Sequence, residues 1–146
     1  MSVKAGSKNS PAPDPDLLAA AVAASQRAYA PYSRFYVGCA VRTASGVIYS
    51  GCNLENESFP AGVCAERAAL AAAVVAEGPT PAVTKMLVYA EDSERKHTAC
   101  APCGVCRQVI IETAADARVA FFGDGCDFIE LEARDLLPHA FKGHLR

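Results

Sequence analysis

The chain has 146 residues, which is long enough for one domain with a substantial hydrophobic core. Apolar residues make up 51% of the sequence and the formal net charge is −2, so general disorder and a basic nucleic-acid-binding surface are both disfavoured. No apolar run approaches the length of a membrane span, and the odd count of seven cysteines argues against a secreted disulfide framework. These features favour a cytoplasmic protein with reduced thiols and a small, neutral or weakly polar ligand.

The N-terminal segment predicts a loose tail followed by a helix. Residues 1–13 are rich in Ser, Pro, Ala and Lys, and we expect them to precede a single domain over residues 14–146. Asp14 can cap a helix whose first position is Pro15, and Pro31 would end it. The larger apolar side chains on roughly one face of this helix are Leu18, Val22 and Tyr29.

The rest of the chain alternates between strand and helix patterns. Apolar runs predict strands at residues 35–43, 47–53, 85–91, 118–122 and 128–132. Helical patterns occupy residues 64–77 and 103–115, a short last helix is expected at 135–137, and a charged loop at 92–101. This order predicts an α/β fold, a three-layer sandwich in which helices flank a central mixed five-stranded sheet.

Two short cysteine phrases lie at the predicted starts of the two longer C-terminal helices. Cys64 and Glu66 belong to the first phrase, and Cys103 and Cys106 belong to the second, which begins with Pro102. Three thiolates suit zinc, and a site with three protein ligands leaves a fourth position open, as catalytic zinc sites do. Helix N-termini favour the thiolate form. The spacing Cys-x-Glu…Pro-Cys-x-x-Cys is typical of zinc-dependent nucleobase deaminases.

The predicted site needs a proton carrier and a positive charge. Glu66 lies two residues after Cys64, where its carboxylate could take a proton from a water at the open position, deliver it to a ring nitrogen and carry another to a departing amine. Three thiolates leave zinc electron-rich, which should limit how far it acidifies this water. Arg67 could offset that charge by donating hydrogen bonds to the ligand sulfurs.

From about Ala28 to Phe141 the chain resembles the small, homotetrameric cytidine deaminases of pyrimidine salvage. The motifs that carry this resemblance are APYSRFYVG at residues 30–38, GCNLEN at 51–56, CAER at 64–67, PCGVCRQ at 102–108 and LLP at 136–138. The resemblance implies hydrolysis of cytidine and 2′-deoxycytidine to the corresponding uridines and ammonia, with one zinc ion in each subunit. It also implies a nucleoside substrate and a homotetramer, with no nucleic acid or membrane as partner.

The resemblance further implies a role for individual residues. The zinc ligands would be Cys64, Cys103 and Cys106, with Glu66 as the acid and base and Arg67 tempering the sulfur charge. Contacts to the nucleoside would come from Asn53 and Glu55 at the ribose 3′-hydroxyl, from Phe35 at the pyrimidine and from the backbone of Ala65. Neighbouring subunits would complete each site with Phe59, which replaces a common tyrosine, and with Phe141.

Two other interpretations stay open at this stage. Cys100 could complete a structural four-cysteine zinc site, which would make the chain a zinc-binding module without turnover. The enzyme could instead deaminate a different aminopyrimidine nucleoside, such as an antibiotic or a modified cytidine. The other thiols, Cys39, Cys52 and Cys126, are expected to be small buried residues and not ligands.

Overall fold

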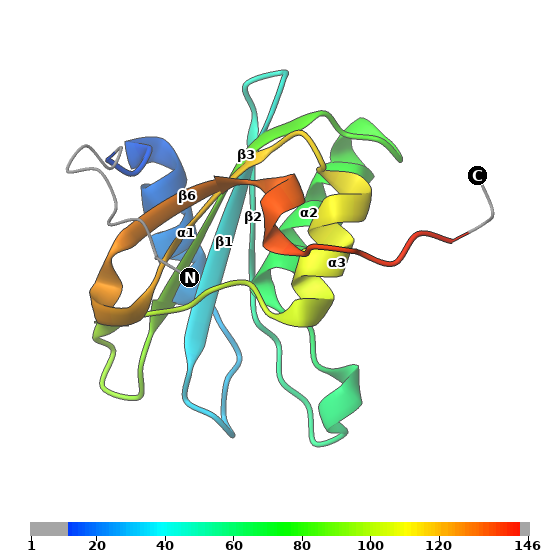
Figure 1. Cartoon of the computed structure of the whole chain (residues 1–146). Coiled ribbons are helices and arrows are strands. Elements are labelled where there is room, and N and C mark those ends of the chain that lie inside the picture. Colours follow the sequence, from blue (N-terminus) through cyan, green and yellow to red (C-terminus); the bar gives the residue numbers. More distant parts are fainter. Residues whose placement is uncertain (1–11, 144–146) are drawn as a thin grey trace, which may run out of the picture.

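The computed structural model describes residues 12–143, in which helices cover both faces of one mixed sheet (Figure 1). Most of the expected tail at residues 1–13 therefore lies outside the described residues. The helices are α1 (Pro15–Ser25), α2 (Ala65–Glu77) and α3 (Gly104–Thr113), and the 3₁₀ turns are η1 (Phe59–Ala61), η2 (Asp124–Cys126) and η3 (Ala133–Leu136). The strands are β1 (Tyr36–Thr43), β2 (Ile48–Cys52), β3 (Val83–Glu91), β4 (His97–Thr98), β5 (Arg118–Phe122) and β6 (Phe128–Glu132).

The main sheet has the strand order β2-β1-β3-β5-β6, and the two-residue β4 pairs with β3 inside the segment that we expected to be a loop. Strand β1 is antiparallel to β2 and β3, and β5 is antiparallel to β6. Only β3 and β5 are parallel, because α3 carries the chain from one to the other as a crossover connection. The predicted α/β fold with a mixed five-stranded sheet is confirmed.

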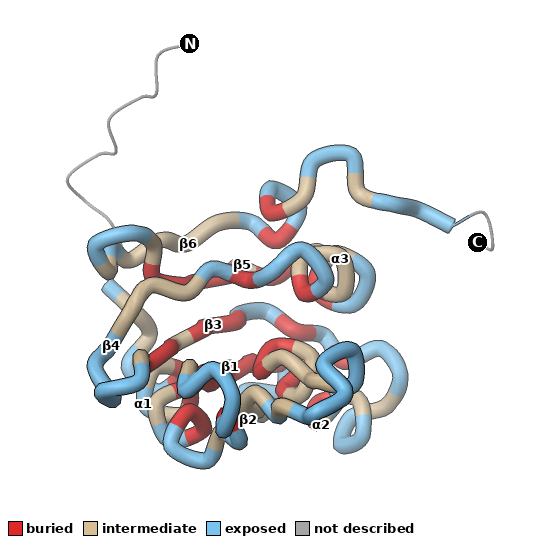
Figure 2. Tube along the Cα trace, turned by 90° about the horizontal axis from the view of Figure 1, so that it is seen from below, coloured by how far each residue is buried: buried red, intermediate tan, exposed pale blue. Residues whose placement is uncertain are grey.

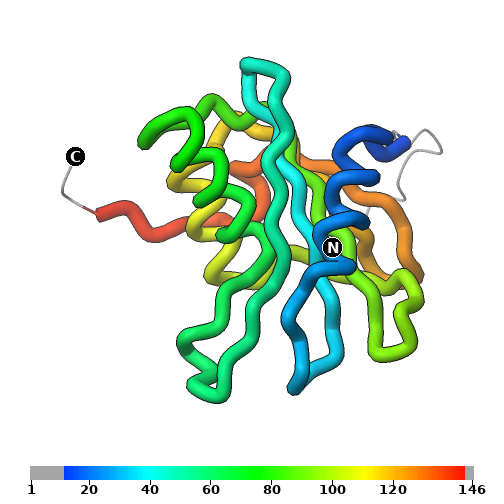
Figure 3. Tube along the Cα trace, turned by 180° about the vertical axis from the view of Figure 1, so that it is seen from behind, coloured from blue at the N-terminus to red at the C-terminus, as the bar shows by residue number. Residues whose placement is uncertain are grey.

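The three layers enclose two hydrophobic clusters, one on each face of the sheet. Helix α1 lies on one face, and α2 and α3 lie together on the other, as the view from behind shows (Figure 3). Successive residues of β3 point to opposite faces, so that Leu87 packs under α1 while Met86 and Val88 pack under α2 and α3. Strand β3 is accordingly among the most buried parts of the chain (Figure 2).

Helix α1 is shorter than predicted and uses a different face. Asp14 caps it as expected, accepting from the amides of Asp16 and Leu17 at 3.2 Å, but the helix ends at Ser25 and not near Pro31. The backbone of Tyr29 pairs instead with the segment after β2, which ends the helix by a tertiary contact. The residues that α1 buries are Leu17, Ala21, Ala24 and Ser25, whereas the predicted face of Leu18, Val22 and Tyr29 is partly or largely exposed.

Two glycines let helices touch the sheet backbone. A Cβ atom on Gly51 of β2 would lie 2.4 Å from the amide nitrogen of Ala69 in α2. On the opposite face, a Cβ on Gly38 of β1 would lie 1.9 Å from the carbonyl oxygen of Ala21 in α1. Both distances are far below van der Waals contact, so only glycine permits these approaches.

The remaining differences from prediction are local. The short helix expected at residues 135–137 is the 3₁₀ turn η3, which begins at Ala133, and α3 ends at Thr113, two residues before the predicted end. In the described part of the chain, no helix has both the length and the apolar character needed to cross a membrane.

Candidate metal centre and active site

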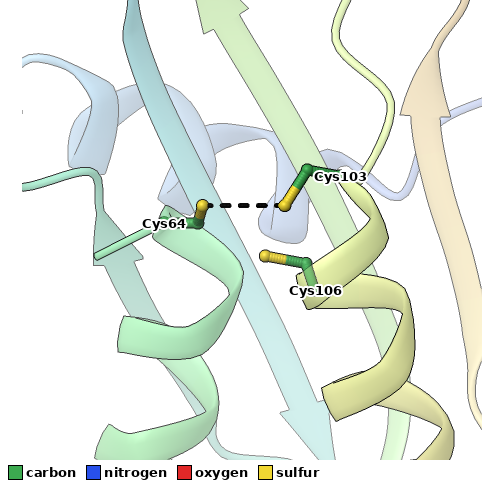
Figure 4. Close-up of side chains that lie close together, drawn as sticks. All are labelled: Cys64, Cys103 and Cys106. Carbon is green, nitrogen blue, oxygen red and sulfur yellow. Dashed lines mark hydrogen bonds between the residues drawn. The ribbon is translucent and has the colours of Figure 1, made fainter. Parts of the chain in front are cut away.

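Three cysteine sulfurs meet where α2 and α3 begin (Figure 4). Cys64 is the N-cap of α2, Cys103 is the N-cap of α3, and Cys106 lies in the first turn of α3. The three Sγ atoms all lie within 4.8 Å of one another, and those of Cys64 and Cys103 are 3.8 Å apart. Two helices that lie side by side on the sheet thus bring together thiols that are distant in the sequence.

The geometry of this cluster fits tetrahedral zinc with one open position. Zn–S bonds of about 2.3 Å in a tetrahedral site place two sulfurs about 3.8 Å apart, which is the spacing of Cys64 and Cys103. Within residues 12–143, no fourth His, Cys, Asp or Glu side chain joins the cluster, and Cys100 is not part of it. The arrangement therefore disfavours a closed four-cysteine site and leaves room for a water or substrate atom.

The electrostatics of the site favour a thiolate at Cys64. Hydrogen bonding from the Cys106 thiol, opposed by burial and assisted by Cys103 and by the charge of Arg67, lowers the pKa of Cys64 to about 6. The pKa of Cys106 is raised, first because its thiol donates a hydrogen bond to Cys64 and second because it is buried. By contrast, burial raises the pKa of Cys100 to about 12, so that residue stays a neutral thiol.

Each of the two helices carries an arginine close to its zinc ligands, Arg67 in α2 and Arg107 in α3. Each arginine donates a hydrogen bond to a carbonyl oxygen in the segment just before its helix. Arg67 donates from Nη2 to the carbonyl oxygen of Gly62 at 2.8 Å, and its buried Nε has no hydrogen-bond partner among the described residues. Arg107 donates to the carbonyl oxygen of Pro102 at 2.8 Å and to that of Leu136 at 3.0 Å. The unpartnered Nε of Arg67 leaves a buried donor available near the sulfur cluster, which supports the predicted role of its charge.

Glu66 has the environment of a general acid and base. It lies in the first turn of α2, is 4% exposed and lines the same cavity as Cys64 and Cys103. Burial raises the pKa of Glu66 above its ordinary value, and the charge of Cys64 adds to this effect. A carboxyl group with a raised pKa exchanges protons more readily near neutral pH than an exposed one does.

A cavity of about 480 Å³ opens over the cysteine cluster. Of the residues that we predicted to contact substrate, four line it: Phe35, Asn53, Glu55 and Ala65. Ala65 is fully buried at the start of α2, so only its backbone is available for contacts. The cavity is large enough for a nucleoside and has few polar groups, which is typical of small-molecule sites.

The side chains of Asn53 and Glu55 already bind protein groups. The Asn53 amide accepts from the Val37 amide and donates to the Phe35 carbonyl oxygen, both at 2.8 Å. The Glu55 carboxylate accepts from the amides of Tyr32 and Ser33 at 2.9 and 3.2 Å, and from the Ser33 hydroxyl. Each side chain is therefore held rigidly at the cavity wall.

Phe59 and Phe141 do not line this cavity within one chain. Phe59 is 76% exposed and meets Tyr32 edge-on at a centroid distance of 6.0 Å, beside a second cavity of about 440 Å³. Phe141 is 77% exposed, and its carbonyl oxygen accepts from Gln108 at 3.0 Å. Their predicted role toward a neighbouring subunit stays a prediction.

Sequence reasoning missed several residues of the cavity. Ser33, Val37, Cys100 and Ala101 also line it. Ser33 lies between a predicted helix stop and a predicted strand, and its contact with Glu55 joins residues 22 apart in sequence. Such a contact has no local signal, because it depends on how two loops meet.

Comparisons with known proteins agree with this fold and site. Residues 12–122 match the family model described as the cytidine and deoxycytidylate deaminase zinc-binding region. The chain is 40% identical to a cytidine deaminase of Halalkalibacterium halodurans over 86% of this chain and 91% of that protein. It is 30% identical to a blasticidin-S deaminase of Bacillus cereus, over 73% and 76% of the two chains. A crystal structure of cytidine deaminase from Burkholderia pseudomallei superposes with a TM-score of 0.78 at 40% identity, covering 89% of this chain and all of that one.

The fold and the three-thiolate cluster thus define a zinc-dependent deaminase. The chain belongs to the cytidine deaminase family, in the small type whose zinc site has three cysteines. Cys64, Cys103 and Cys106 are the zinc ligands.

Proposed function

We propose that this enzyme hydrolyses cytidine and 2′-deoxycytidine to uridine and 2′-deoxyuridine, releasing ammonia for pyrimidine salvage. The observation that carries the proposal is a buried carboxyl group, Glu66, in the same cavity as an open three-thiolate zinc site. The Asn53 and Glu55 side chains at the cavity wall support a nucleoside over a free base.

Zinc, when bound, acts as a Lewis acid that lowers the pKa of a water, so that its hydroxide form is available to attack carbon at neutral pH. Glu66 would take a proton from the attacking water as the water oxygen bonds to C4 of the pyrimidine, and would deliver that proton to the ring nitrogen N3. The same carboxylate would then carry the proton of the resulting C4 hydroxyl to the exocyclic nitrogen. The C4–N bond breaks as the C4 carbonyl forms, and the nitrogen leaves as ammonia. The raised pKa of Glu66 suits both transfers, because the group must accept and release a proton in one turnover.

The sugar contacts that we propose use the hydrogen-bonding positions of Asn53 and Glu55 that no protein group occupies. A carboxylate offers about four acceptor positions, and three donors already occupy Glu55. Asn53 uses one N–H toward Phe35, so one amide N–H remains. One donor and one acceptor side by side fit a single hydroxyl, and we assign them to the ribose 3′-hydroxyl. Phe35 and the Ala65 backbone would then bind the pyrimidine.

We propose a homotetramer in which neighbouring subunits complete each site. Large apolar side chains stand exposed on one chain, including Tyr32, Phe59 and Phe141. Phe59 lies beside the second cavity, which shares Ser33 and Glu55 with the catalytic cavity. A second copy that covered these aromatics would enclose the substrate and exclude water from it.

A substrate panel tests the proposal directly. The zinc-loaded enzyme should deaminate cytidine and 2′-deoxycytidine, with much lower kcat/KM for cytosine, cytidine monophosphate and blasticidin S, as followed by the change in ultraviolet absorbance. Glu66→Gln should retain zinc and lose nearly all turnover, because the amide cannot carry the proton. Turnover of Glu66→Gln at the wild-type rate, or a preference for free cytosine, would contradict the proposal.

A further inference from the structure

Among the described residues, the Ser33 hydroxyl joins two predicted substrate contacts, Glu55 and Phe35. Its Oγ donates to the Glu55 carboxylate and accepts from the Phe35 amide at 3.0 Å. Its own amide and that of Tyr32 also donate to Glu55. The loop between α1 and β1 is thereby fastened to the loop after β2, and both loops lie at the same end of the molecule (Figure 3).

The backbone around Ser33 is shaped for this contact. Arg34, which follows it, has a left-handed φ of 53° and donates from its amide to the Ala30 carbonyl oxygen at 3.0 Å. This conformation closes a turn that points two successive amides at one carboxylate, an arrangement that binds anions well. A non-glycine residue in the left-handed region is a small cost that surrounding contacts must maintain.

Asn53 extends the same network to Phe35, just before β1, and to Val37 within β1. Its amide bonds both the Phe35 carbonyl oxygen and the Val37 amide, so Phe35 is held on one side by Ser33 and on the other by Asn53. The chain of contacts runs from the predicted sugar-binding carboxylate to the predicted base-binding ring through Ser33. No other side-chain hydroxyl among the described residues is shown bonded to both partners.

We propose that Ser33 is a positioning residue that sets the selectivity of this site for nucleosides with a 3′-hydroxyl. It holds the Glu55 carboxylate so that its one remaining acceptor position faces the sugar. This inference rests on the proposed function, because it assumes that Glu55 binds the ribose. The Glu55 carboxylate is also kept ionised. Burial opposes this, but the Ser33 hydroxyl and the two amides lower the pKa of Glu55, which leaves its remaining position an acceptor for the substrate hydroxyl.

The test compares two substrates and three variants of the zinc-loaded enzyme. Ser33→Ala should lower kcat/KM for cytidine about 10-fold, mainly through KM, because it removes one charge-assisted hydrogen bond to Glu55. For 3′-deoxycytidine, kcat/KM should change less than about 2-fold, because that substrate has no hydroxyl for Glu55 to bind. Ser33→Thr keeps the hydroxyl and should restore most of the preference. Ser93→Ala, in the exposed turn after β3, is the matched control.

Each outcome decides the inference. Loss confined to cytidine, with rescue by threonine and unchanged zinc content, supports it. Equal losses for both substrates would show that Ser33 acts on the fold and not on selectivity, and would overturn it, as would an unaltered cytidine KM in Ser33→Ala. Failure of the proposed function is seen separately, since the wild-type enzyme itself would then not deaminate cytidine.

Discussion

Gly51 links the packing of the sheet to the position of the zinc ligands, so Gly51→Ala should damage both stability and activity. Its Cβ would lie 2.4 Å from the Ala69 amide nitrogen and 2.7 Å from the Ala68 carbonyl carbon. These are backbone atoms that no rotamer change can move, so α2 would have to retreat by roughly 1 Å to reach van der Waals contact. Overpacking of this kind costs about 1–3 kcal/mol and sometimes more.

The consequence for activity follows because α2 begins at a zinc ligand and at the carboxyl group that we propose to be catalytic. Cys64 caps that helix and Glu66 lies in its first turn, so a displaced α2 moves both relative to α3. A 1 Å misplacement can cost about 100-fold in rate. We expect a fall in kcat/KM of about that size and a thermal midpoint lower by roughly 3–10 °C.

Gly38→Ala is the matched control for this experiment. It makes the same chemical change against the Ala21 carbonyl oxygen, but on the α1 face of the sheet, away from the zinc site. It should also lower the thermal midpoint, while the surviving folded enzyme keeps kcat/KM within a few-fold. The variants would be compared at low temperature by circular dichroism, zinc content and initial rates. Wild-type stability in Gly51→Ala, or equal activity losses in the two variants, would refute the reasoning.

Three further predictions follow from single contacts. Asp14→Ala should destabilise the protein by about 1 kcal/mol by removing the α1 cap and the ion pair with Arg42, whereas Asp14→Asn should keep most of the cap. Burial raises the pKa of Asp14, but the Leu17 amide and Arg42 lower it by more, so the net pKa is lowered. The charge of Asp14 therefore stabilises the fold above about pH 4, and this contribution is lost as the pH falls further. Denaturant melts of wild type and Asp14→Asn should accordingly converge at low pH. Arg67→Ala should move the acidic limb of the pH–rate profile to higher pH, because the positive charge near the thiolates is gone; an unmoved limb would reject this role. Cys100→Ser should keep one zinc per chain and near-normal activity, and loss of zinc would revive the four-cysteine interpretation.

Elements set by interactions between neighbouring residues were predicted correctly, whereas features set by contacts between residues distant in the sequence were not. Strands β5 and β6 match their predicted bounds, because an apolar run and a glycine-rich turn are both local signals. The predicted end of α1 was wrong by several residues. The helix ends at Ser25, before Pro31, because the Tyr29 backbone pairs with the segment around Leu54. The predicted buried face of α1 was also wrong, because the helix packs closely against Gly38 through Ala21 and Ser25, which both have small side chains.

Local sequence patterns predicted the chemistry of the site: Cys64, Cys103 and Cys106 as zinc ligands, Glu66 beside them, and two helices that begin at those residues. Such features depend on spacing within one turn of a helix and on the ligand preference of the metal, and both are readable from local sequence. Three features depend on the tertiary fold: the hydrogen bond from Ser33 to Glu55, the bonds of Asn53 to the backbone of Phe35 and Val37, and the set of aromatic side chains that are exposed. Those properties arise where distant loops meet, and the free energy of such contacts depends on geometry that no local pattern encodes.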